Sequence, residues 1–201
     1  MQIVFNGEIY NFAEVKSKCS GYPFRTNGDT EALLAAYEKY GMAPGPLKGM
    51  FAFALWDSQK QELLLVRDRM GVKPLYYYAD NSRLVFSSEI RPLLKSGFVP
   101  HEMSYNAVLD FFSFQSMGTG ETIVKGVNQV PPGGYIRIST TTFEAGLYWD
   151  ITNTREEFDF NDEKEIQKKV FSLLTSAVQR RMVGDVPIGA FYLEELTQVL
   201  W

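Results

Sequence analysis

The chain has 201 residues, of which 45% are hydrophobic and 22% are charged, and its formal net charge is −4 at pH 7. This balance is typical of one folded domain with a short extension, and it excludes a disordered chain. The negative charge argues against a general nucleic-acid binder. The longest apolar run, residues 50–56, is too short to span a bilayer, and no secretory signal opens the sequence. We therefore expect a cytoplasmic protein with neither nucleic acid nor membrane as a partner.

Cysteine and histidine are scarce. The single cysteine, Cys19, excludes an internal disulfide, and the single histidine, His101, excludes a mechanism that needs two histidines. No cluster of cysteine and histidine offers a zinc site, so we expect no metal. The sequence therefore contains few candidates for a nucleophile or a general base.

The first forty residues alternate between strand and helix patterns. A strand is expected over residues 2–5 and a short helix over residues 11–18. Residues 21–28 contain two glycines, a proline and an asparagine, which is typical of a loop. Alanine, leucine and glutamate dominate residues 30–40, which predicts a helix that stops at Gly41.

The next segment has the period of two that is typical of strands. Residues 50–57 alternate two apolar sets, so both faces of this strand should be covered. A turn and a second strand over residues 62–67 follow. Residues 75–79 and 84–87 predict another hairpin. Strands that are apolar on both faces and joined by tight turns indicate two sheets packed face to face.

The second half has fewer clear patterns. We expect a helix over residues 105–114, a rigid turn over residues 130–135 that enters a strand, and a polar linker over residues 150–162. A long helix over residues 163–182 carries an apolar stripe at helical spacing. Asp162 is expected to begin this helix in a capping box with Glu165.

The first motif that could carry chemistry is Asn6-Gly7, at the end of the opening strand. An amide side chain beside a backbone N–H without a neighbouring Cβ could place two donors on a developing oxyanion. The alternative is a simple turn, because Asn-Gly is a strong turn dipeptide. On the motif alone, the turn is favoured.

The second motif is Asp29, directly before the helix over residues 30–40. An aspartate at this position is expected as an N-cap for the first N–H groups of the helix. The functional alternative is a carboxylate that binds a substrate ammonium group.

The third motif places charged residues around a glycine turn in residues 67–76, followed by residues 87–90. A solvated loop is the favoured interpretation, because surface charge pairs are usually worth little. A salt-bridge network that fixes a site or an interface is the alternative.

Together these motifs resemble the glutaminase half of glutamine-dependent asparagine synthetases. These are class II amidotransferases of the N-terminal-nucleophile (Ntn) hydrolase superfamily. The resemblance runs from Gln2 to Phe191. The segments that carry it are residues 6–11, 28–31, 47–57, 67–76, 86–90, 130–133 and 184–191. It implies an α+β fold, an Ntn-hydrolase-type αββα sandwich of two antiparallel sheets between helical layers, here expected to lack its first strands.

The resemblance also implies site residues. Asn6 and Gly7 would form the oxyanion hole, and Asn6, Gly7, Glu8 and Asp29 would bind glutamine. The family's nucleophile is a cysteine at the mature N-terminus, whose own α-amino group serves as the base. Residue 1 of this sequence is Met1, so we expect the nucleophile to be missing and the chain to be inactive alone. Cys19 has no evident adjacent base, so a catalytic role for it is disfavoured.

The carboxyl-terminal end departs from the family as well. Residues 184–191 resemble the strand that opens the family's ATP-pyrophosphatase domain, but residues 192–201 lack the small residues of a phosphate-binding loop. The full-length family uses ATP and Mg²⁺, whereas we expect this chain to bind no cofactor. The expected organisation is a glutaminase domain over 1–150, a linker over 151–162, the start of a synthetase domain over 163–191 and an unrelated tail over 192–201.

Three functions remain open. The first is a fragment of a glutamine-hydrolysing asparagine synthase, whose parent reaction is ATP-dependent transfer of amide nitrogen from glutamine to aspartate. The second is a non-catalytic module that binds glutamine or a partner protein. The third is a truncated reading frame without function. The expected partners are glutamine and either a second copy of the chain or a synthetase domain.

Overall fold

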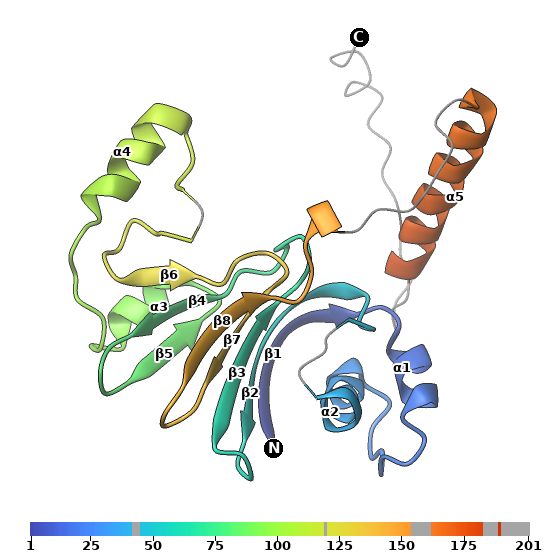
Figure 1. Ribbon diagram of the computed structural model, residues 1–201, viewed down its shortest axis with the longest axis horizontal. Helices are drawn as coiled ribbons and strands as arrows, with labels where there is room; N and C mark the ends of the chain where they lie inside the picture. Colours follow the sequence, from blue (N-terminus) through green and yellow to red (C-terminus); the bar gives the residue numbers. More distant parts are fainter. Residues whose placement is uncertain (42–44, 119, 154–161, 183–188, 190–201) are drawn as a thin grey trace. The chain divides into compact units, whose positions relative to one another are not determined.

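Two antiparallel sheets form the centre of unit Met1–Glu156, the first of two units into which the chain divides (Figure 1). The second unit is Glu157–Trp201. This computed structural model describes residues 1–41, 45–118, 120–153, 162–182 and 189.

The larger sheet has five strands and the smaller has three. The larger sheet has the order β1 (Gln2–Ile9), β2 (Gly49–Asp57), β3 (Glu62–Arg67), β7 (Gly134–Ile138), β8 (Phe143–Leu147). The smaller sheet has the order β5 (Leu84–Ser87), β4 (Tyr76–Ala79), β6 (Val127–Gln129). The helices of this unit are α1 (Phe12–Lys18), α2 (Asp29–Tyr40), α3 (Ile90–Lys95), α4 (Tyr105–Phe114) and the short 3-10 helix η1 (Ile151–Asn153).

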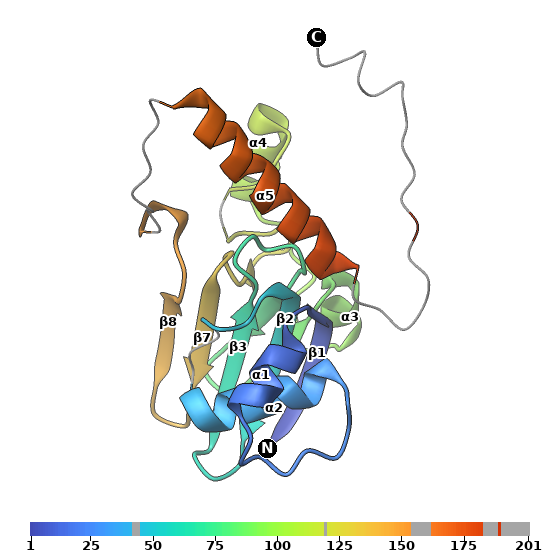
Figure 2. The ribbon, with the colours of Figure 1, turned by 90° about the vertical axis from the view of Figure 1, so that its right-hand side faces the viewer.

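The two faces of β2 pack against different layers. Phe51, Phe53 and Leu55 are buried in a core that also contains residues of α1 and α2, and Figure 2 shows these helices lying across β1 to β3. The alternate residues Ala52 and Ala54 lie in a second core, together with partly buried residues of β4 and β5. Both faces of the strand are covered, as its pattern predicted.

The smaller sheet is covered on its other side by α3. Leu93 of α3 is buried with Val99, Val124 and Val127, against side chains from β4 and β5. The layers are therefore helix, sheet, sheet, helix, which confirms the predicted α+β sandwich of two antiparallel sheets between helical layers.

The turn interpretation of Asn6-Gly7 is wrong. β1 runs through both residues to Ile9, with Asn6 opposite Ala52 and Gly7 opposite Phe51 in β2. The long apolar β2 supplies a pairing partner for the whole segment, and this tertiary pairing overrides the local turn preference.

Most predicted elements are present, with small shifts at their ends. The hairpins β2–β3 and β4–β5, helix α4 and strand β7 are confirmed, and α2 ends at Tyr40 with Gly41 as its C-cap, whose φ is 67°. Four short elements were not predicted, namely α3, β6, β8 and η1. β6 and β8 have three and five residues, and their pattern is too short or too exposed to signal a strand.

The solvated-loop interpretation of residues 67–76 is also wrong. Arg67 and Asp68 are only 7% and 1% exposed. Among the described residues no ion pair joins the two, so the salt-bridge alternative does not describe them either. Their side chains instead bond to backbone groups, because a buried charge is tolerated only when its hydrogen bonds are satisfied.

The second unit contains α5 (Glu163–Arg181), as predicted. Its N-cap is Asp162, whose side chain accepts hydrogen bonds from the N–H groups of Lys164 and Glu165. The predicted apolar stripe is largely exposed, including Val170 at 48% and Leu174 at 61%. The polar linker and the segment over 184–191 fall mostly outside the described residues. No helix in the described ranges is long and apolar enough to cross a bilayer.

Candidate functional site

A cavity of about 390 Å³ lies where β1 and β2 meet the end of β5. The cavity is open at this point because Ala52 and Ala54 of β2, which form part of its wall, have small side chains. Its polar lining consists of Asn6 of β1 and the successive residues Ser87, Ser88 and Glu89. The cavity therefore offers an amide, two hydroxyls and a carboxylate within a largely apolar wall.

Asn6 is fixed by a contact between the two sheets. Its Nδ2 donates a hydrogen bond to Oγ of Ser88 at 2.9 Å. Ser88 directly follows β5 and lies 82 residues beyond Asn6 in the chain. One amide hydrogen of Asn6 is thus committed to the protein, and the other remains for a ligand in the cavity.

The N–H of Gly7 points away from the β1–β2 ladder. Phe51, which lies opposite Gly7, exchanges hydrogen bonds with Asp68 on its other side, through Phe51 N to Asp68 Oδ2 and Asp68 N to Phe51 O. In an antiparallel ladder each residue directs its N–H and C=O to one side, so Gly7 and Phe51 form a pair without mutual hydrogen bonds. Because β1 is at the edge of its sheet, the Gly7 N–H is directed outward.

Gly7 must be a glycine for steric reasons. Its φ is +147°, and a Cβ at this position would collide with the carbonyl oxygen of Met50 and the Cα of Phe51. The backbones of β1 and β2 approach too closely for a side chain here. The same residue therefore allows the close strand pairing and leaves its N–H unobstructed.

Asp29 is not the N-cap of α2, contrary to the sequence prediction. Gly28 is the N-cap and Asp29 is the first helical residue. The carboxylate reaches back to β1, where Oδ2 accepts a hydrogen bond from the N–H of Ile9 at 3.0 Å. An outward-directed N–H of an edge strand requires an acceptor, and Asp29 provides it. The structure therefore brings Asp29 to the end of the strand that carries Asn6 and Gly7.

Glu8 lies between these groups and is exposed. It faces Met50 across the ladder and shares the strand face of Asn6, because side chains two residues apart lie on one side of a sheet. Asn6, Gly7 and Glu8 are thus consecutive, and Asp29 is bonded to the residue that follows them. This is the group of residues that the sequence analysis proposed.

Cys19 lies in a different part of the domain. It is 3% exposed and belongs to the core between α1, α2 and the five-stranded sheet. Asn6 is directed to the opposite face of that sheet, towards the cavity. Although polar residues surround Cys19 in the sequence, its side chain is a core residue.

Sequence reasoning missed the hub formed by Arg67 and Asp68. The Asp68 carboxylate accepts four backbone hydrogen bonds, from the N–H groups of residues 51, 70, 72 and 73. The Arg67 guanidinium donates to three carbonyls, those of residues 71, 73 and 130. Burial lowers the pKa of Arg67, and the neighbouring Asp68 charge opposes that shift. No local pattern distinguishes such a hub from a charged loop.

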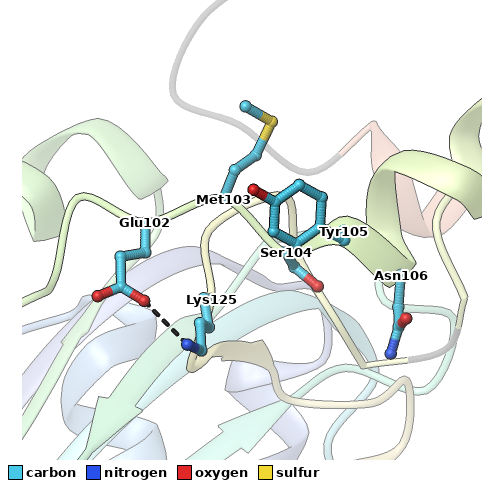
Figure 3. Close-up of a pocket in the computed structure, with 6 residues that line it drawn as sticks. All are labelled: Glu102, Met103, Ser104, Tyr105, Asn106 and Lys125. Atoms are coloured by element: carbon cyan, nitrogen blue, oxygen red, sulfur yellow. Dashed lines mark hydrogen bonds and ion pairs between the residues drawn. The ribbon is translucent and has the colours of Figure 1, made fainter.

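A second hollow, of about 580 Å³, lies at the start of α4 and contains none of the predicted site residues (Figure 3). Glu102 and Lys125 form an ion pair of 2.9 Å across it. Within the described ranges, no group of three or more His, Cys, Asp or Glu side chains could hold a metal ion.

The chain resembles several characterised proteins. Residues 1–149 match the family described as glutamine amidotransferase domain. Asparagine synthetase [glutamine-hydrolyzing] 1 of Bacillus subtilis is 34% identical over 94% of this chain and 30% of its own length. Amidase chry2 of Gibberella zeae is 34% identical over 94% of this chain and 28% of its own. The chain thus spans about a third of the length of these relatives.

A solved structure of glutamine phosphoribosylpyrophosphate amidotransferase from B. subtilis overlaps 73% of this chain and 29% of its own, with a TM-score of 0.48 and 19% identity. The family match covers most of the chain and includes β1, the cavity and Asp29. The chain therefore belongs to the glutamine amidotransferase domain family and is related to the glutamine-hydrolysing asparagine synthetases.

Proposed function

We propose that the cavity beside Asn6 binds the side-chain amide of glutamine and stabilises the oxyanion that forms when this amide is attacked. The observation that carries the proposal is the pair of donors on successive residues, the Asn6 amide beside the cavity and the outward N–H of Gly7. Attack on the amide carbon moves the C=O electron pair onto oxygen, and two fixed donors stabilise that charge. Collapse of the intermediate restores the C=O bond and breaks the C–N bond, and the leaving nitrogen takes the proton that the nucleophile gave up and departs as ammonia.

Glu8 and Asp29 are proposed to bind the α-amino group of glutamine. Asp29 uses Oδ2 for the N–H of Ile9, which holds its carboxylate at the end of β1. A carboxylate already fixed by a backbone bond loses little freedom when it binds an ammonium group.

The nucleophile is proposed to come from outside the residues described at this site. The only cysteine of the chain, Cys19, is buried on the other side of the five-stranded sheet. We therefore expect no glutamine turnover by this chain alone. The longer protein is proposed to be an asparagine synthetase, with ATP, Mg²⁺ and aspartate bound by its synthetase part, and this chain is proposed to bind no cofactor. Homodimerisation, or pairing with the synthetase part, belongs to the same proposal.

The domain boundaries are part of this proposal too. The family match ends at residue 149 and the first unit ends at Glu156, which supports a glutaminase domain over 1–150 and a linker over 151–162. A synthetase segment over 163–191 and an unrelated tail over 192–201 complete the assignment. The intact mass of the protein in its host tests whether this chain is part of a longer protein, because a mass above that of 201 residues indicates one.

Calorimetric titration with glutamine tests the site itself. We expect binding at millimolar glutamine, and affinity that falls roughly ten- to hundredfold in Asp29→Asn, because a hydrogen bond to a charged group is lost. This substitution keeps an oxygen for the N–H of Ile9, so folding should be preserved. Asp80→Asn is the matched control, since Asp80 also accepts backbone N–H groups, but in an exposed turn. Folded protein that releases no heat with glutamine would rule out the proposal.

A further inference from the structure

Two successive serines at the end of β5 have different partners. Ser87 Oγ accepts a hydrogen bond from the N–H of Glu89, two residues away, at 3.2 Å. Ser88 Oγ accepts one from Nδ2 of Asn6 at 2.9 Å. Both serines are half-buried and both line the cavity. Ser87 thus stabilises its own turn, whereas Ser88 acts on a residue of the other sheet.

The orientation of the Asn6 amide depends on such a partner. The terminal torsion of asparagine is broad, so the plane of the carboxamide is weakly fixed by its own rotamer. When one amide hydrogen is bonded to Ser88, the planar group is fixed and the direction of the second hydrogen is set. That hydrogen is the donor that the proposed oxyanion hole requires.

We propose that Ser88 is the positioning residue for the Asn6 amide, which it holds in the orientation needed to bind the glutamine carbonyl. The inference rests on the proposed glutamine site. It adds a residue from the second sheet to a site that otherwise comes from β1 and the start of α2. The Asn6 amide belongs to one sheet, and the Ser88 hydroxyl that holds it follows a strand of the other. The site therefore depends on the correct packing of the two sheets.

The contact can be tested without glutamine. The side-chain NH₂ group of Asn6 gives an NMR signal in ¹⁵N-labelled protein, identified by its loss in Asn6→Ala. We expect Ser88→Ala to move this signal, because the bonded hydrogen loses its acceptor. Ser88→Thr keeps the hydroxyl and should restore the wild-type signal. Ser82→Ala, in the exposed turn between β4 and β5 and outside the cavity, is the control and should leave it unchanged. An Asn6 signal that is insensitive to Ser88→Ala would overturn the inference.

Glutamine titration of the same variants tests the consequence. We expect Ser88→Ala to weaken glutamine binding roughly 3- to 10-fold, the effect of one neutral hydrogen bond, in protein that still folds. Ser88→Thr should restore binding, and Ser82→Ala, in the exposed turn between β4 and β5, should bind as the wild type does. Equal affinity in wild type and Ser88→Ala would overturn the positioning role. A folded wild type that does not bind glutamine overturns the proposed function, and the role of Ser88 with it, although the NMR signal still reports the contact.

Discussion

Two pairs of residues break the apolar pattern of a strand. One pair is Asn6-Gly7 in β1, and the other is Arg67-Asp68 at the end of β3. The side chains of Arg67 and Asp68 are almost fully buried and bond to seven backbone groups. Asn6 makes one side-chain bond, to Ser88, and lies beside a cavity. Gly7 directs its N–H away from the ladder.

The difference separates a structural role from a functional one. Where every polar atom of a side chain is satisfied by the protein's own backbone, nothing is left for a ligand, and the residue holds the loop in place. Where a side chain is anchored by one bond and retains a second donor beside a cavity, it is ready to bind. The charge on Arg67 and Asp68 would suggest the active site, but the uncharged pair is the better candidate.

Asp68→Asn should produce the largest loss of stability. Each carboxylate oxygen accepts two backbone N–H groups, so an NH₂ group in place of either oxygen leaves two buried donors facing a donor. We expect a loss of roughly 2–6 kcal/mol in the free energy of unfolding, measured by urea denaturation. Asp80→Asn in the exposed β4–β5 turn should cost far less. Equal losses for the two substitutions would remove the structural side of the comparison.

Gly7→Ala should follow. The added Cβ meets backbone atoms of Met50 and Phe51, which cannot move without separating β1 from β2. Strain at the positive φ adds to this overlap, so we expect a loss of roughly 2–4 kcal/mol in the free energy of unfolding. Gly21→Ala is the control, because nothing lies within 4 Å of a Cβ there. If Gly7→Ala were as stable as Gly21→Ala, the close approach of the two strands would be disproved.

Local patterns were sufficient for the layers but not for the site. The two apolar sets of β2 predicted that both faces are covered, and periodicity located both central hairpins. Asn6-Gly7 was read locally as a turn, although pairing with β2 makes it a strand. Asp29 was read as a cap, although its partner is the N–H of Ile9, twenty residues earlier. Ser88 and Asn6 are 82 residues apart, and no periodicity indicates a contact between side chains of different sheets.

Tyr148→Phe should give the smallest effect and refine the structural side of the comparison. The Tyr148 hydroxyl donates to the carbonyl of Arg67 at 2.9 Å, so its loss should cost about 1 kcal/mol at neutral pH. Burial, reinforced by the Asp68 charge, raises the pKa of Tyr148 well above its ordinary value. The neutral phenol therefore contributes its full stabilisation below the unfolded pKa of about 10 and loses it progressively as the pH rises further.

Urea denaturation at neutral pH and at a series of pH values above about 10 measures this dependence. The wild type should lose stability faster than Tyr148→Phe as the pH rises, because only the wild type must keep this phenol protonated in the fold. Tyr105→Phe is the control, since Tyr105 on α4 is 82% exposed. Parallel pH curves for wild type and Tyr148→Phe would show that Tyr148 is not buried against the Arg67-Asp68 hub. Converging curves would show that Tyr148, which directly follows β8, is part of the hub. A neutral phenol would then stabilise the hub together with the charged side chains.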